Sequence, residues 1–170
     1  VTGNDLPGSI DSDVINSVDY LNLMVYDNPV PHSTYSAAES AISHWKNIEG
    51  LPKDKTVLGV PFYARTNGYV KYKDIIAQYG TEAAYIDDAG GNDYNGIPTI
   101  QAKTQLGLEE AGGIMYWEVT QDTLDDTSLM SAIWDVVKSQ ETGDGSGTVT
   151  PWMEGQDYIA GDIVKFENKF

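Results

Sequence analysis

The sequence predicts a parallel α/β fold followed by a separate, small β segment. Three short, almost continuous apolar runs, at residues 20–26, 56–62 and 113–117, alternate with segments whose apolar residues recur at helical spacing. An unbroken apolar run is typical of a strand that is buried on both faces. The order strand, helix, strand, helix, strand, helix implies parallel pairing with right-handed crossovers.

The first run, Tyr-Leu-Asn-Leu-Met-Val-Tyr at residues 20–26, is followed by a turn-rich stretch and then by a helix. The apolar stripe of that helix consists of Tyr35, Ala38, Ile42, Trp45 and Ile48. Ser36 and Glu39 have capping-box spacing near its start, and Gly50 and Pro52 close it. The segment therefore has both a start and a stop signal.

The second strand covers residues 56–62, Thr-Val-Leu-Gly-Val-Pro-Phe, and Pro61 marks its end. The stretch at residues 66–95 is expected to leave the main fold. It contains one short helix, at residues 72–79, and then a glycine-rich loop at residues 87–96.

The third strand, at residues 113–117, lies between two further helices. The helix before it begins at Pro98, because proline is pre-organised for the first helical turn, and ends before Gly112. The helix after it has Asp126 or Thr127 as its expected cap. Its apolar stripe consists of Leu129, Met130, Ile133, Trp134 and Val137.

The composition changes sharply at residues 141–150, where Gly, Ser and Thr dominate, and this stretch is predicted to be a linker. Beyond it, residues 151–170 contain a turn and a short strand at residues 163–166, followed by an expected hairpin tip. A single hairpin is marginal in water, so this piece is interpreted as the start of a small β module.

The 170 residues include 10 basic and 26 acidic side chains, which gives a formal net charge of −16. This charge excludes a nucleic-acid binder, which needs Lys and Arg to displace counterions, and it disfavours an anionic membrane surface. Hydrophobic residues make up 41% of the chain, enough for a packed core. The absence of cysteine excludes a disulfide scaffold and a thiolate metal site, and no apolar run approaches the roughly 20 residues of a membrane span. The sequence predicts no cofactor and no metal.

Each of the three strands ends with an aromatic residue that has a charged neighbour. The pairs are Tyr26 with Asp27, Tyr63 with Arg65, and Trp117 with Glu118. In parallel α/β folds the ligand site lies beyond the carboxyl ends of the strands, although polarity also returns there for purely structural reasons. An acidic, aromatic site without obvious metal ligands suits a neutral polyhydroxylated ligand.

Three motifs at these positions resemble the chitinases of glycoside hydrolase family 18. Met-Val-Tyr-Asp at residues 24–27 resembles the family's Met-x-Tyr-Asp strand end. Gly-Val-Pro-Phe-Tyr-Ala-Arg at residues 59–65 resembles Gly-x-Pro-x-Tyr-Gly-Arg, departing only in Ala64, and Gly-Gly-Ile-Met-Tyr-Trp-Glu at residues 112–118 resembles the final strand. The resemblance covers residues 15–138 and implies strands six to eight of a TIM (β/α)8 barrel.

The resemblance implies that residues 1–140 are the C-terminal part of this barrel, that residues 141–150 are a linker, and that residues 151–170 begin a chitin-binding module of the kind common in bacterial chitinases. In the module, Trp152 and Tyr158 would stack on sugars or form its own core.

The resemblance also implies a substrate-assisted retaining mechanism, in which a glutamic acid protonates the glycosidic oxygen and the substrate's acetamido carbonyl attacks the anomeric carbon. Tyr26 would hydrogen-bond the acetamido group, and Asp27 would support the same subsite. Both would therefore assist catalysis.

The same resemblance assigns substrate-binding residues and a partner. Trp117 would form the floor of the site, with Met24 beside it and Glu118 next in the chain. Tyr63 and Arg65 would contact neighbouring sugars. The implied partner is chitin or a chito-oligosaccharide, and the implied location is extracellular.

The acid glutamate of the family is missing from this sequence. It belongs to an Asp-x-x-Asp-x-Asp-x-Glu motif, and neither Asp87-Asp88 nor Asp125-Asp126 has that spacing. We therefore interpret the chain as the C-terminal part of a longer secreted enzyme and expect it to be inactive alone. We also expect its open strand edges to associate with the N-terminal part of the barrel or with another copy.

Two alternatives stay open. One is a chitinase-like lectin that binds but does not cleave, and the other is a hydrolase of another N-acetylglucosamine polymer, such as peptidoglycan. The chitin-like module favours the chitinase, because such modules hold an enzyme on an insoluble surface and raise its local concentration.

Several side chains are given ordinary structural roles. His32 and His44 are expected to be exposed or partly buried rather than ligands. The loop at residues 87–93 lacks the ligand pattern of an EF-hand and is interpreted as an acidic surface loop. Trp45 and Trp134, on apolar helical stripes, are assigned to the core.

Overall fold

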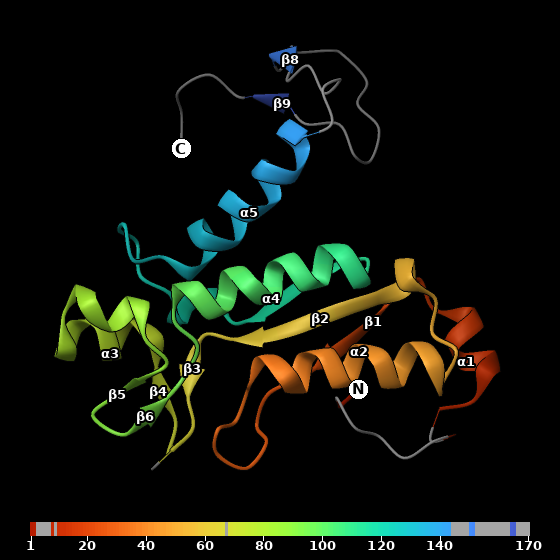
Figure 1. Ribbon diagram of the computed structural model, residues 1–170, viewed down its shortest axis with the longest axis horizontal. Coiled ribbons are helices and arrows are strands. Elements are labelled where there is room, and N and C mark those ends of the chain that lie inside the picture. Colours follow the sequence, from red (N-terminus) through yellow and green to blue (C-terminus); the bar gives the residue numbers. More distant parts are fainter. Residues whose placement is uncertain (3–7, 9, 67, 144–149, 152–163, 166–170) are drawn as a thin grey trace. The chain divides into compact units, whose positions relative to one another are not determined.

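The computed structural model describes residues 1–2, 8, 10–66, 68–143, 150–151 and 164–165 (Figure 1). It divides into two compact units, Val1–Val137 and Lys138–Phe170, each of which is described by itself. The first unit contains, in order, α1 (Ser12–Ser17), β1 (Leu21–Met24), α2 (Tyr35–Asn47), η1 (Lys53–Lys55), β2 (Thr56–Pro61), β3 (Tyr63–Ala64), β4 (Val70–Lys71), α3 (Tyr72–Tyr79), η2 (Thr81–Tyr85), β5 (Asp88–Ala89), β6 (Asn92–Asp93), α4 (Ile97–Glu110), β7 (Gly113–Trp117), η3 (Val119–Gln121) and the first turns of α5 (Leu129–Gly143).

The centre of the first unit is a parallel sheet of three strands in the order β1, β2, β7. Leu23 lies opposite Leu58, which in turn lies opposite Ile114. Helices α2 and α4 lie side by side over one face of this sheet (Figure 1). The predicted alternation of parallel strands and helices is therefore present.

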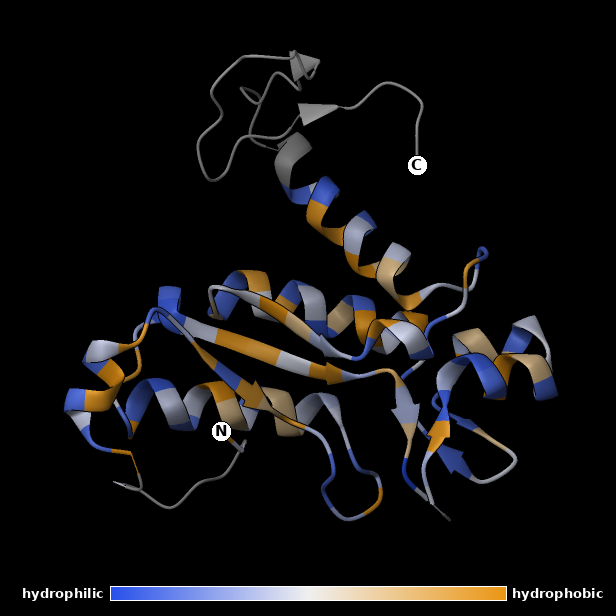
Figure 2. Ribbon diagram, turned by 180° about the vertical axis from the view of Figure 1, so that it is seen from behind, coloured by the Kyte–Doolittle hydropathy of each residue, from blue (hydrophilic) through white to orange (hydrophobic). Residues whose placement is uncertain are grey.

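Only one face of the sheet is deeply buried. Leu23, Leu58 and Val60 point toward the helices and are fully buried. On the other face, Met24 is 41% exposed and Trp117 is 55% exposed. Figure 2 shows the molecule from this side, with the strands in front of the helices. The expectation of strands buried on both faces is wrong for β1 and β7, because an apolar run does not show how many layers cover it.

Helix α2 begins at Tyr35, and its cap lies two residues before the predicted one. The hydroxyl of Thr34 accepts a hydrogen bond from the Ala37 amide at 3.1 Å, so Thr34 is the N-cap and the Ser36–Glu39 capping box is wrong. Trp45 is fully buried, as predicted, and its indole nitrogen donates to the Thr2 carbonyl at 3.1 Å.

Helix α5 is capped by Ser128 rather than by Asp126 or Thr127. The Ser128 hydroxyl accepts a hydrogen bond from the Ser131 amide at 3.1 Å. The buried carboxylate of Asp122 accepts the Leu129 and Met130 amides, both at 2.9 Å. A carboxylate at the start of a helix also meets the positive end of the helix dipole.

Two predictions about single side chains are wrong. Trp134 is 47% exposed, because the buried stripe of α5 runs through Leu129, Ala132 and Ile133 instead. His32 is 0% exposed rather than partly buried. His44 is half-buried, as expected.

The segment between β2 and α4 leaves the sheet, as predicted. It contains the antiparallel pair β3–β4, helix α3 with the predicted bounds, and the antiparallel pair β5–β6. The glycine-rich stretch is the turn of the second pair: Gly90 and Gly91 have φ of +61° and +79°, which only glycine adopts readily. Helix α4 follows, with Pro98 in its first turn.

The second unit contains the end of α5 and two short strands, β8 (Thr150–Pro151) and β9 (Val164–Lys165), which pair in parallel. β9 lies within the predicted strand at residues 163–166. Trp152 and Tyr158, together with the expected hairpin tip, lie outside the described residues. Within the part of the chain that the structure describes, no helix is long and apolar enough to cross a bilayer.

Candidate active site

A concavity of about 610 Å³ opens beside the carboxyl ends of β1 and β7. Its lining residues are Val1, Asn22, Met24, Tyr26, Met115, Tyr116, Trp117, Glu118 and Val119. Four of the residues predicted from sequence therefore share one surface: Met24, Tyr26, Trp117 and Glu118. The exposed apolar side chains of this surface suit the face of a sugar ring.

Asp27, Tyr63 and Arg65 come together next to this concavity. The Tyr63 hydroxyl donates a hydrogen bond to Oδ1 of Asp27 at 2.8 Å, and the Arg65 guanidinium lies 3.6 Å from the same oxygen. The rings of Tyr26 and Tyr63 are nearly perpendicular, with centroids 6.2 Å apart. One cluster thus joins the ends of β1 and β2, and it consists of four of the predicted residues: Tyr26, Asp27, Tyr63 and Arg65.

The protonation of this cluster follows from its burial. Burial raises the pKa of Tyr63 far above its ordinary value, and the hydrogen bond to Asp27 and the negative charge of Asp27 raise it further. The Tyr63 hydroxyl therefore stays protonated and acts as a donor. Burial and the charge of Asp27 also raise the pKa of Tyr26. The Asp27–Arg65 pair is half-exposed and contributes little stability by itself.

The backbone of Asp27 is held in the left-handed region, with φ of 64°, by a histidine that sequence reasoning gave no role. The Asp27 amide donates to Nδ1 of His32 at 3.4 Å, and the His32 ring packs 5.4 Å from the Tyr63 ring. Burial lowers the pKa of His32, which keeps Nδ1 available as an acceptor. His32 therefore positions the Asp27 loop from beneath.

Asp93, on β6, connects the segment between β2 and α4 to both sides of this cluster through hydrogen bonds. Its carboxylate accepts the His32 amide at 2.6 Å. Its own amide donates to the Thr66 hydroxyl at 2.7 Å, and its carbonyl accepts the Arg65 amide at 3.2 Å. One residue thus holds the chain segment beside Asp27 and the segment that carries Arg65.

Lys103 lies under the same loop and was also missed. It is 0% exposed, and its ammonium donates to the Ser33 carbonyl at 2.7 Å, the Ser33 hydroxyl at 2.8 Å and Oδ1 of Asn95 at 2.6 Å. Burial lowers the pKa of Lys103 to about 7, against the opposing effect of Asp87 and Asp93. The sequence does contain an indication that Lys103 is buried: it lies three residues from Ile100 and three from Leu106, on the buried face of α4.

Trp117 and Glu118, at the end of β7, have different surroundings: the Trp117 side chain is exposed, and the Glu118 carboxylate is hydrogen-bonded within the chain. The peptide bond between them is cis, and the Trp117 side chain is 55% exposed. The carboxylate of Glu118 accepts hydrogen bonds from the hydroxyl and amide of Thr120 and from the Gln121 side chain. These bonds, those of Thr120 above all, lower the pKa of Glu118, so its carboxylate is ionised and engaged in capping η3.

Gly59, in the middle of β2, is needed for the close approach of β1. A Cβ at this position would lie 2.6 Å from the Leu23 carbonyl oxygen and 3.1 Å from Cε1 of Tyr26. We expect Gly59→Ala to lower the free energy of unfolding by about 2 kcal/mol, because the clash with backbone can be relieved only by moving β1. Urea denaturation measures this, and a loss below about 0.5 kcal/mol would show that the strands have room to spare.

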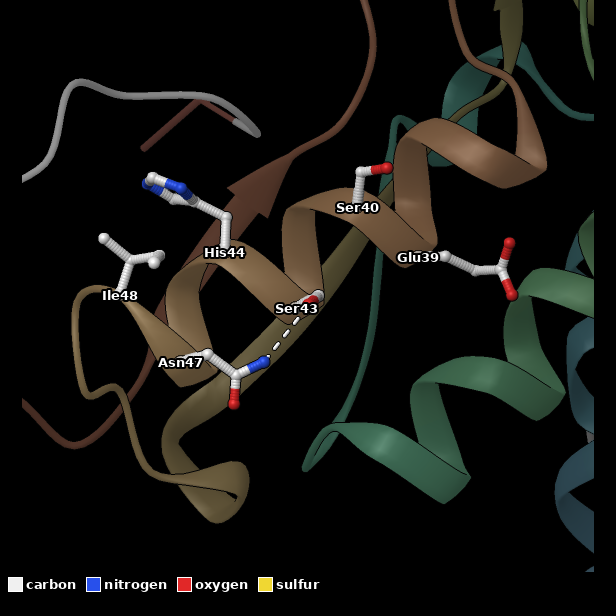
Figure 3. A pocket seen from close by; sticks show the side chains of 6 residues that line it. All are labelled: Glu39, Ser40, Ser43, His44, Asn47 and Ile48. Carbon is white, nitrogen blue, oxygen red and sulfur yellow. Dashed lines mark hydrogen bonds between the residues drawn. The ribbon is translucent and has the colours of Figure 1, made fainter.

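A second depression lies on the outer face of α2, away from the strand ends (Figure 3). Its lining residues are Glu39, Ser40, Ser43, His44, Asn47 and Ile48. The Asn47 side chain donates to the Ser43 hydroxyl at 3.1 Å, and none of the predicted site residues lines it. Across the residues the structure covers, no group of three His, Asp or Glu side chains is placed to hold a metal.

The chain matches solved chitinase structures. The GH18 chitinase ChiB from the chitin utilization locus of Flavobacterium johnsoniae is 32% identical, with a TM-score of 0.76, and the match covers 82% of this chain and 48% of that chain. A chitinase from Bacteroides thetaiotaomicron is 28% identical, with a TM-score of 0.68, over 76% of this chain and 48% of that one. The fold resembles part of a chitinase TIM barrel.

The chain spans about half the length of these solved chains. A chitinase-like agglutinin from Robinia pseudoacacia, 24% identical with a TM-score of 0.59 over 76% of this chain and 49% of that one, shares the fold. No family model matches the sequence, and no curated protein matches it either. The predicted α/β fold and its likeness to chitinase barrels are thus confirmed, while the assignment to strands six to eight stays a prediction.

Proposed function

We propose that this chain forms the acetamido-binding side of a chitinase-type active site and binds β-1,4-linked N-acetylglucosamine oligomers. The observation that carries the proposal is the Asp27–Tyr63 hydrogen bond, with Tyr26 beside it, at the strand ends of a fold shared with chitinases. The exposed Trp117 and Met24 supply an apolar floor next to this polar cluster. Such a site recognises a sugar through one face and an amide through fixed donors.

In this proposal the Tyr26 hydroxyl, kept protonated by its raised pKa, donates to the substrate's acetamido carbonyl oxygen. That oxygen attacks the anomeric carbon while the glycosidic bond breaks, and a glutamic acid gives its proton to the departing oxygen. Water then attacks the anomeric carbon of the cyclic intermediate and gives a proton back to the glutamate, which breaks the bond to the acetamido oxygen and restores the acetamido group. The chain's part is positioning, which removes much of the entropy cost of the attack.

The acid is proposed to come from residues other than those of this chain, because the sequence has no Asp-x-x-Asp-x-Asp-x-Glu motif. We expect the purified 170-residue chain to leave chitotetraose intact over a day of incubation, as measured by chromatography of the products. Turnover that resists further purification and is lost in Asp27→Ala would contradict this assignment of the acid.

Binding is tested by calorimetric titration of the purified protein with chitotetraose and with cellotetraose, which has hydroxyls in place of the acetamido groups. We expect chitotetraose to bind at least about tenfold more tightly, since the acetamido contacts are the basis of recognition. Equal affinities, or no binding of chitotetraose, would overturn the proposal.

A binding protein without hydrolytic activity is the second candidate, favoured by the shared fold of the Robinia agglutinin and by the missing motif. Both candidates predict the same preference for chitotetraose. The two candidates differ in the residue that occupies the last position of the Asp-x-x-Asp-x-Asp-x-Glu motif in the part of the barrel proposed to lie outside this chain. A glutamic acid there supports the enzyme, and another residue supports the lectin.

The edges of the described sheet are proposed to pair with further strands. β1 and β7 are its outer strands. Among the described residues, Val1 and Thr2 lie along β1 from Asn22 to Met24: the Val1 ammonium donates to the Asn22 carbonyl at 3.0 Å, and the Met24 amide donates to the Val1 carbonyl at 2.8 Å. Unpaired strand edges promote association. We expect light scattering to give a mass well above the 18.6 kDa of one chain, and a strictly monomeric protein would count against this proposal.

A further inference from the structure

Tyr69, just before β4, presents an aromatic ring beside Tyr63 of the candidate site. Its ring stacks on that of Tyr63, with centroids 4.5 Å apart and planes inclined by 29°. Tyr63 is 2% exposed, whereas Tyr69 is 48% exposed. The Tyr69 ring is therefore supported by a buried neighbour that is itself fixed by Asp27, while much of its surface faces solvent.

The hydroxyl end of Tyr69 is fixed as well. It accepts a hydrogen bond from the side-chain amide of Gln121, which is 4% exposed and also donates to Glu118 at 3.1 Å. Burial, together with the charges of Glu118 and Asp27, raises the pKa of Tyr69 against the opposing effects of Gln121 and Trp117. Tyr69 thus bridges the β3–β4 hairpin to the segment that follows Trp117.

A rigid, half-exposed aromatic ring is an efficient binding group, because little rotamer entropy remains to be lost when a ligand covers it. Tyr69 and Trp117 are both about half-exposed and lie at the same end of the sheet. Other exposed tyrosines, such as Tyr20 before β1, lie elsewhere on the fold.

We propose that Tyr69 is a further carbohydrate-binding residue, which stacks on a sugar unit next to the one held over Trp117 and so lengthens the site by one unit. This inference rests on the proposed function. It requires that Tyr69 contribute more to long oligomers than to short ones, because in this proposal the additional sugar unit that stacks on Tyr69 is present only in the longer ligands.

The test is calorimetric titration of the wild type, Tyr69→Ala and Tyr69→Phe with N-acetylglucosamine oligomers of two to five units. We expect Tyr69→Ala to weaken binding of the tetramer and pentamer about tenfold and that of the dimer less than twofold. Tyr69→Phe keeps the ring and loses the Gln121 link, so it should retain most of the affinity. Tyr20→Ala, which removes an exposed tyrosine before the start of β1, is the matched control and should bind like the wild type.

Equal losses for all lengths would show that Tyr69 acts by holding Tyr63 and Asp27, and would overturn the inference. Unchanged binding of the long oligomers by Tyr69→Ala would also overturn it, while the proposed function would stand. If the wild type binds no oligomer of any length, the proposed function itself fails, and the inference fails with it. Thermal unfolding of each variant establishes that the proteins compared are folded.

Discussion

Replacing Asp27 by alanine is expected to weaken chitotetraose binding about thirtyfold, which corresponds to about 2 kcal/mol. The carboxylate of Asp27 accepts the Tyr63 hydroxyl and lies beside Arg65, so its loss frees two of the groups that define the site. Alanine also tolerates the left-handed backbone at this position less well than aspartate does. Calorimetry gives the change in affinity directly.

Asparagine at position 27 separates these effects. It keeps an oxygen for Tyr63 and tolerates the positive φ, but it removes the charge beside Arg65, so a loss of only about fivefold is expected. Asp19→Ala changes an exposed aspartate at the other end of β1 and serves as the control. An Asp27→Ala protein that is folded and binds chitotetraose as the wild type does would remove Asp27 from the site.

Replacing Lys103 by methionine is expected to lower the free energy of unfolding by about 3 kcal/mol. Methionine fills similar space, but the Ser33 hydroxyl and Oδ1 of Asn95 lose the donor that Lys103 supplies inside the protein. The Ser33 carbonyl keeps the side-chain amide of Asn95, at 2.8 Å. The relief of a desolvated charge offsets part of this cost. Urea denaturation measures the change against Lys53→Met, an exposed lysine of η1, and a loss below about 1 kcal/mol would contradict the account.

The same lysine makes stability depend on pH. Its pKa is about 7 in the folded protein and lies near the ordinary value of 10.5 in the unfolded chain. Between these values only the unfolded chain holds the proton, so stability rises with pH by up to about 1.4 kcal/mol per pH unit, and below about pH 7 the full penalty applies. The difference in unfolding free energy between wild type and Lys103→Met, measured from pH 6 to pH 9, should follow this course. A difference that is flat across the range would show that Lys103 stays charged in the folded protein.

The elements of the fold could be predicted where the local sequence is decisive. Helix α3 has the predicted bounds, and strand β7 begins and ends where its apolar run does. The caps of α2 and α5 could not be read as easily, because several hydroxyl and carboxylate side chains precede each helix. Only tertiary structure selects Thr34 and Ser128 among them.

The candidate site was predicted only where it lies on strand ends. Tyr26, Asp27, Tyr63 and Arg65 meet because parallel strands end at one edge. The groups beneath them come from segments far apart in sequence: His32 follows β1, Asp93 belongs to β6, and Lys103 belongs to α4. No local sequence pattern links these three residues. The prediction that Trp134 is buried was wrong for a related reason, because an apolar stripe on a helix does not show which part of the fold covers it.

Asp93 gives the two sides of the site a common mechanical anchor. Through its carboxylate it holds the loop that carries Asp27, and through its backbone it holds the segment of Arg65 and Thr66. A change in the β5–β6 hairpin that displaces Asp93 would therefore act on the Asp27 loop and on the Arg65 segment at the same time.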